Sequence, residues 1–109
     1  MDGLLSGNKR TYEDFKKMIP QESKPLFEEI RDYCLSLGTN VVEDVRMHRI
    51  VFCKSMSFRG FADIEPQRDS VIAKIRRDRK EPLKEIEIKQ GQSLEELKGL
   101  ILDAYSNIR

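Results

Sequence analysis

Apolar residues recur every three or four positions near both ends of the chain and every second position between them. The first of these periods is typical of a helix with one buried face, and the second is typical of strands in a sheet. In residues 23–37 the spacing predicts a helix that begins near Ser23 and ends before Gly38. Its apolar face comprises Leu26, Ile30, either Tyr33 or Cys34, and Leu37.

A second helix is predicted near the end of the chain, over residues 94–107. Ser93 and Glu96 have the spacing of a capping box at its start. Gly99 lies inside it and costs up to ~1 kcal/mol relative to Ala, so we expect a neighbouring strand or helix to approach closely there. The apolar face of this helix comprises Leu94, Leu97, Ile101, Ala104 and Ile108.

Alternation with a period of two predicts strands between the helices. The segments between the first three strands, 54–57 and 65–69, are short and turn-like, so we expect antiparallel neighbours. The last strand has Ile86 and Ile88 on one side and charged residues on the other. The strands are expected over residues 50–53, 58–64, 71–75 and 84–89.

This order of elements predicts an α+β two-layer sandwich, in which an antiparallel sheet of about four strands carries the N- and C-terminal helices on one face. Residues 1–22 are expected to form an extension or a short docking helix ahead of a single domain over 23–109. Val51, Phe61 and Ile72 alternate with the main apolar set. We therefore expect the second sheet face to be partly apolar, and one hypothesis is that two copies form a homodimer through it.

Composition narrows the class of protein. The chain has 109 residues, of which 39% are apolar and 36% charged, which fits one domain with a real core. No run approaches the ~18 apolar residues of a membrane span, and residues 1–10 lack a secretory apolar block, so we expect a cytoplasmic protein with no membrane partner. Cys34 and Cys53 are expected to pack in the core, and with His48 as the one histidine we expect no metal and no cofactor.

Charge is unevenly distributed along the chain. The total is 20 basic against 19 acidic residues, but residues 41–80 hold ten basic and six acidic ones, a local balance of +4. Such a patch can contact the phosphates of a nucleic acid; a solvated loop is the other interpretation. Arg46, His48, Arg49 and Arg59 would widen the patch if neighbouring strands brought them to the same side. Its centre comprises Lys74, Arg76, Arg77, Arg79 and Lys80.

A second candidate site consists of Asp63 with Glu87 and Lys89. Metal-dependent nucleases use two carboxylates on Mg²⁺ and a Lys near the attacking water, and positions 87 and 89 of one strand share a face. The alternative is a solvated face of an amphipathic strand, which the intervening strand 71–75 favours.

The strand segment Phe61-Ala62-Asp63-Ile64-Glu65-Pro66, between the apolar stretches 50–53 and 71–75, resembles a family of small domains often labelled "predicted transport protein". The closing Leu94-Glu95-Glu96-Leu97, with Ile101, Ala104 and Tyr105, is similar to the final helix of that family. The resemblance implies a helix, strands, helix layout, and members of the family occur alone or beside nuclease-like and restriction-associated regions. It implies a fold, and no defined activity.

Two functional hypotheses follow. In the first, the chain is a non-catalytic accessory or interaction domain that binds a macromolecule, with nucleic acid as the candidate partner, through the open sheet face or its basic edge. In the second, it is a metal-dependent nuclease-like enzyme that uses Asp63, Glu87 and Lys89. The distance between the two carboxylates separates these hypotheses, because a shared metal requires them to lie close together.

Overall fold

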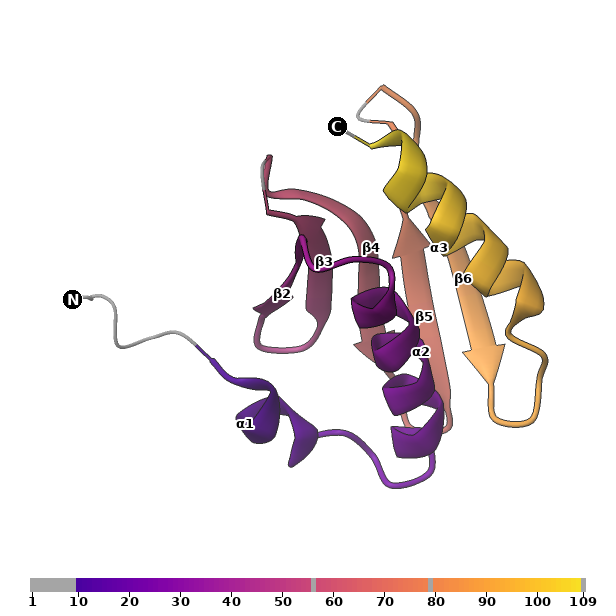
Figure 1. Ribbon diagram of the computed structural model, residues 1–109. Helices are drawn as coiled ribbons and strands as arrows, with labels where there is room; N and C mark the ends of the chain where they lie inside the picture. The colour runs from indigo at the N-terminus through magenta and orange to yellow at the C-terminus, as the bar shows by residue number, and fades with distance from the viewer. Residues whose placement is uncertain (1–9, 56, 79, 109) are drawn as a thin grey trace.

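The protein folds as a five-stranded antiparallel sheet in the order β2-β3-β4-β5-β6, with its helices on one side (Figure 1). The computed structural model describes residues 10–55, 57–78 and 80–108. This confirms the predicted α+β class, with five strands in place of about four. The elements are α1 (Tyr12–Lys16), α2 (Lys24–Ser36), β2 (Val41–Val45), β3 (Ile50–Lys54), β4 (Arg59–Pro66), β5 (Ser70–Ile75), β6 (Lys84–Lys89) and α3 (Glu95–Asn107).

The additional strand, β2, lies at one edge of the sheet and pairs only with β3 among the described strands. Glu43 interrupts its apolar alternation, because it faces the helices although it is charged. There Arg31 of α2 pairs with both carboxylate oxygens of Glu43, so the charge is neutralised at the rim of the core.

Strand pairing determines which residues share a face of the sheet, since directly opposed residues point the same way. Ile64 lies between Ile50 and Ala73, and this buried row faces the helices. The next row, one residue along, points to the other side. We call the side turned away from α2 and α3 the open face.

A bulge in β4 corrects one expectation. The register shifts between Phe52 and Cys53, so that Phe61 is an extra residue in the strand. Phe61 therefore turns toward the helices, is fully buried and meets the ring of Tyr105 edge-on at 5.4 Å between centroids. The expectation that Phe61 lies on the second face is wrong, and Val51 is left there only half-buried.

The ends of the helices also differ from expectation. Ser23 precedes α2, but its buried hydroxyl donates to the carbonyl oxygen of Gln67 at 2.7 Å and makes no side-chain cap. A Cβ at Gly99 would meet nothing within 4 Å, so the predicted close approach is wrong. Phe15 and Ile19 are buried, which fixes α1 on the core.

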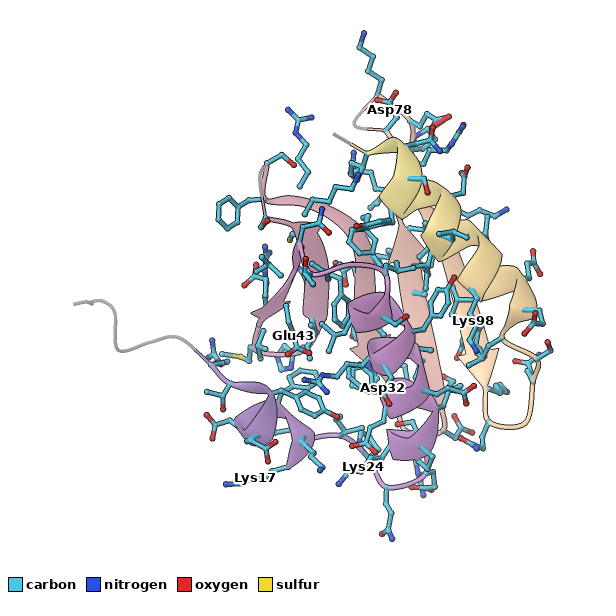
Figure 2. The ribbon with its side chains drawn as sticks, viewed as in Figure 1. Lys17, Lys24, Asp32, Glu43, Asp78 and Lys98 are labelled. Carbon is cyan, nitrogen blue, oxygen red and sulfur yellow. The ribbon has the colours of Figure 1, made fainter. Side chains whose placement is uncertain are left out.

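Both cysteines are buried and unpaired. Cys34 packs in the core as expected, whereas Cys53 alternates with Phe52, lies opposite Gly60 and is not part of the core cluster. Figure 2 shows the charged residues Lys17, Lys24, Asp32 and Lys98 on the helical side of the molecule. In the part of the chain that the structure describes, no helix is long and apolar enough to cross a membrane.

Candidate functional site: a basic groove on the open face

A groove of about 560 Å³ crosses one end of the open face, between the β3–β4 turn and the β5–β6 loop. Three strands, β3, β4 and β5, contribute to it, together with the β2–β3 turn, the β5–β6 loop and the end of α3. We call it the basic groove. It is lined by Arg46, Val51, Arg59, Gly60, Ala62, Asp63, Lys74, Arg76, Leu83 and Ile108.

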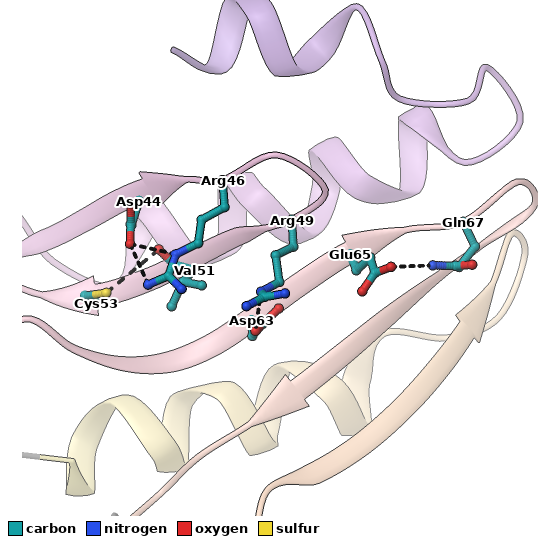
Figure 3. Close-up of polar contacts among 8 residues, drawn as sticks. All are labelled: Asp44, Arg46, Arg49, Val51, Cys53, Asp63, Glu65 and Gln67. Carbon is teal, nitrogen blue, oxygen red and sulfur yellow. Dashed lines mark hydrogen bonds and ion pairs between the residues drawn. The ribbon is translucent and has the colours of Figure 1, made fainter. Parts of the chain in front are cut away.

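The β2–β3 turn brings Arg46 and Arg49 over the open face (Figure 3). The backbone N–H of Arg46 donates to the carbonyl oxygen of Arg49 at 2.9 Å, which closes the turn. Arg46 then donates from Nε and Nη2 to Asp44 Oδ2, at 3.1 and 2.9 Å. Its side chain remains 51% exposed, so an anion can reach the guanidinium without displacing buried structure.

Asp63 is the acidic residue among those that line the groove. Arg49 Nε lies 3.0 Å from Asp63 Oδ2, close enough for an ion pair, but its N–H is not aligned for a hydrogen bond, and Asp63 Oδ1 has no hydrogen-bond partner. Burial raises the pKa of the Asp63 carboxyl above its ordinary value of 3.8, and the charges of Arg49 and Lys74 offset part of the rise. The groove therefore holds a carboxylate that is incompletely compensated.

Gly60 leaves room at the centre of the groove. It follows the β3–β4 turn and pairs with Cys53 beside the bulge. A Cβ at this position would lie 2.6 Å from Val51 Cγ1, closer than real side-chain contacts. Only glycine fits here without displacing Val51, and its missing side chain exposes the strand between the basic residues.

Four basic side chains and one acidic side chain line the basic groove. Two of them, Lys74 and Arg76, belong to the patch predicted from sequence. Alternation along β5 gives them the same side, because they lie two residues apart. Arg46 and Arg59 join them from other elements, and they are two of the four residues that were expected to widen the patch.

The rest of the predicted patch lies elsewhere. Arg77 Nε pairs with Asp103 Oδ2 of α3 at 2.9 Å, and Arg77 Nη1 lies 3.6 Å from Glu81 Oε1, so its guanidinium is held on the helical side. Lys80 is exposed in the β5–β6 loop, where its backbone N–H donates to Asp78 Oδ1 at 2.9 Å. Arg79 lies outside the described residues.

His48 does not join the groove; it lines a separate depression of about 360 Å³ with Met18 and Met47 beside α1. Two groove residues had no sequence signal of their own. Gly60 follows Arg59 at the start of β4, and Leu83 follows a proline in the β5–β6 loop. Both residues reach the groove because the register of the strands places the β3–β4 turn and the β5–β6 loop at the same end of the sheet.

The candidate nuclease residues share the open face but do not converge. Asp63 is paired with Lys74, which is paired with Glu85, so β5 lies between Asp63 and β6. Glu87 is two residues farther along β6 and accepts a hydrogen bond from Ser70 Oγ at 2.6 Å. Two strand spacings alone separate the carboxylate-bearing backbones by roughly 9.6 Å.

Lys89 is opposite Ser70, at the far end of β5 from the basic groove. Within residues 10–55, 57–78 and 80–108, no cluster of three or more His, Cys, Asp or Glu side chains is arranged to hold a metal ion. Asp63 thus belongs to the basic groove, while Glu87 and Lys89 lie outside it.

Comparisons with protein-family models, with curated proteins and with solved structures found no match.

Proposed function

We propose that the chain is a non-catalytic interaction domain that binds nucleic acid through its phosphates, with the basic groove as the binding site. The observation that carries this proposal is the convergence of four cationic side chains from three segments of the chain on one groove. These side chains are Arg46, Arg59, Lys74 and Arg76.

Arginine predominates in the groove, and this favours phosphate as the ligand. A guanidinium presents planar, paired donors that match two phosphate oxygens, and it keeps its charge at every physiological pH. The groove is also open to solvent rather than enclosed, so a phosphate that belongs to a longer chain can reach its cations.

The alternatives are less well supported. Asp63 and Glu87 stand on strands separated by β5, which disfavours a shared metal and therefore the nuclease hypothesis. With Phe61 buried against α3, the apolar part of the open face consists mainly of Val51 and Ile72, so a homodimer through that face has less area to bury than expected. The unpaired thiols of Cys34 and Cys53 fit the reducing cytoplasm that we propose as its compartment.

The test is fluorescence anisotropy of labelled DNA of about 20 nucleotides, single-stranded and duplex, over a series of salt concentrations. The triple variant Arg59→Gln, Lys74→Gln and Arg76→Gln removes three groove charges. We expect the affinity of the native chain to fall steeply as the salt concentration rises. On single strands the variant should bind at least about tenfold more weakly, and its slope of log affinity against log salt concentration should be shallower by about two.

The matched control removes the same charge away from the groove. Lys17→Gln, Lys24→Gln and Arg68→Gln lower the net charge equally, at positions just after α1, on α2 and in the β4–β5 turn. We expect this control to bind within about twofold of the native chain. Absence of binding in dilute buffer, equal losses in both variants, or equally tight binding of polyglutamate would each overturn the proposal.

A further inference from the structure

We propose that the basic groove selects single-stranded over duplex nucleic acid by stacking an unpaired base on the ring of Phe58. This inference rests on the proposed function and specifies its ligand. It comes from an exposed aromatic residue in the β3–β4 turn, which borders the groove.

Phe58 has an exposed fraction of 72%, the largest among the exposed large hydrophobic side chains of the described residues. The other phenylalanines in the described segments, at positions 15, 27, 52 and 61, are buried. Burying a phenyl group is among the main gains of folding, so a ring left in water is available to a partner.

Chain connectivity places the backbone of Phe58 beside the basic groove. Phe58 immediately precedes Arg59 and Gly60, both of which line the groove, and one residue spans about 3.8 Å between Cα atoms. The backbone N–H of Phe58 donates to the carbonyl oxygen of Lys54 at 2.7 Å, which anchors the turn to the end of β3. A strand whose phosphate meets Arg59 therefore has a base within reach of Phe58.

The backbone of Phe58 is unfavourable for this residue type. Its φ is +54°, in the left-handed region that bulky side chains rarely adopt and that glycine adopts freely. A ring that is exposed and also conformationally costly contributes little to stability. Strained residues of this kind concentrate at binding sites.

A second exposed apolar side chain lies across the groove. Leu83 is 45% exposed at the end of the β5–β6 loop and is itself part of the groove lining. The cations Arg59 and Arg76 thus lie between two exposed apolar groups, one from each hairpin end. Sites for single strands combine cations, which bind the phosphate backbone, with apolar surfaces, on which the bases stack.

Strand selection follows from the accessibility of bases. In a duplex the flat faces of the bases are covered by their neighbours, so Phe58 would meet only the backbone and groove edges. In a single strand a base can unstack and lie on the ring, an interaction that depends little on sequence. The cations of the groove can bind the phosphates of single-stranded and of duplex nucleic acid, whereas Phe58 can stack only on a base of a single strand.

The test compares Phe58→Ala, Phe58→Gly and Phe58→Trp on the same two labelled DNA probes. We expect Phe58→Ala to weaken single-strand binding roughly 5- to 150-fold while duplex affinity changes less than about twofold. Phe58→Gly should bind equally weakly yet melt at a higher temperature, because glycine relieves the left-handed strain. This outcome separates loss of stacking from loss of folding.

Phe58→Trp keeps an aromatic face and introduces the sole tryptophan of the chain. It should retain single-strand affinity within about threefold, and its fluorescence should be quenched by single-stranded DNA more than by duplex. Leu102→Ala, at a 47% exposed position on α3, is the control and should leave both affinities unchanged.

Equal affinity for the two probes, or a Phe58→Ala variant that binds single strands like the native chain, would overturn stacking while leaving the proposed function intact. A protein that binds neither probe overturns both. Loss of duplex and single-strand binding together in Phe58→Ala, with loss of folding excluded by the Phe58→Gly variant, also contradicts strand selection by Phe58.

Discussion

Arg49 of the β2–β3 turn and Asp63 of β4 form an ion pair at the edge of the basic groove, with 3.0 Å between Arg49 Nε and Asp63 Oδ2. The pair neutralises Asp63 only partly, since Oδ1 is buried without a hydrogen-bond partner. Because Asp63 also lies beside Lys74, its negative charge opposes an incoming phosphate. The acid thus limits the affinity that the surrounding cations can reach.

Asp63→Asn should therefore strengthen nucleic-acid binding. Removing one unit charge from a site that binds phosphate changes the free energy of binding by about 1 kcal/mol or more, which is roughly fivefold in affinity. The measurement is the anisotropy titration at fixed salt. Asp32→Asn, an exposed acid on α2, provides the matched control, and equal gains from both substitutions would contradict a local role for Asp63.

The same substitution should change how stability depends on pH. The folded pKa of Asp63 is raised, mainly by burial, so on raising the pH the unfolded chain releases this proton first. Stability is then lost as the pH rises from the ordinary pKa through the folded one. In urea unfolding at several pH values, the free energy of unfolding of the Asp63→Asn variant should rise relative to that of the native chain from about pH 4 upward. The difference should become constant above the folded pKa. A difference that stays constant with pH would contradict the raised pKa.

Periodicity was sufficient to predict the two long helices, four of the five strands and the α+β class. Strand β2 escaped because Glu43 interrupts its alternation, and Glu43 is tolerated facing the helices only because Arg31 reaches it from α2. Phe61 was assigned to the wrong face because the bulge in β4 reverses the alternation from that residue. Both misses depend on contacts between segments far apart in the chain.

The candidate site was partly predictable for a similar reason. Lys74 and Arg76 share a side by local alternation, and Arg77, one residue on, turns to Asp103. By contrast, Arg46 and Arg59 reach the same groove through the register of β2, β3 and β4, which a single sequence does not specify. The density of charge along the sequence indicates which part of the chain contains the basic groove. Which of its basic residues line the groove depends on how the strands pair.

Two glycines with opposite surroundings make a stability test. Gly60→Ala forces a Cβ to 2.6 Å from Val51 Cγ1 and should destabilise the protein by about 1 to 3 kcal/mol. Gly99→Ala adds a methyl group in open space within α3 and should stabilise it by about 0.5 to 1 kcal/mol. Chemical denaturation of both variants checks the signs. If Gly60→Ala leaves the stability unchanged, Val51 of β3 can move away from the added methyl group without cost.

The contact between α1, α2 and β2 can be tested by a double-mutant cycle. Arg31 pairs with both oxygens of Glu43, and its guanidinium carbon lies 3.6 Å from the ring centroid of Tyr12. The Arg31 and Glu43 side chains are 22% and 17% exposed, so removing one leaves the other poorly solvated. Arg31→Met and Glu43→Met should each cost about 1 to 3 kcal/mol.

The double variant should cost less than the sum of the two, with a coupling free energy of about 1 to 2 kcal/mol. Additive costs would mean that the two side chains do not interact in solution. Tyr12→Phe serves as a control, because it keeps the ring beneath Arg31 and removes only the hydrogen bond from its hydroxyl to Glu28.

Cys34 should be inert in the native protein and limit stability at high pH. Its side chain is fully buried, and burial raises the pKa of its thiol from 9.0 to about 12. The unfolded chain therefore ionises this thiol first, and stability should fall as the pH rises from about 9 toward 12. In a Cys53→Ser background, a thiol-specific dye should label the native chain very slowly and the denatured chain at once. Rapid labelling of the native chain would mean that α2 opens readily from the sheet, since the dye reaches Cys34 only when this helix lifts from the core.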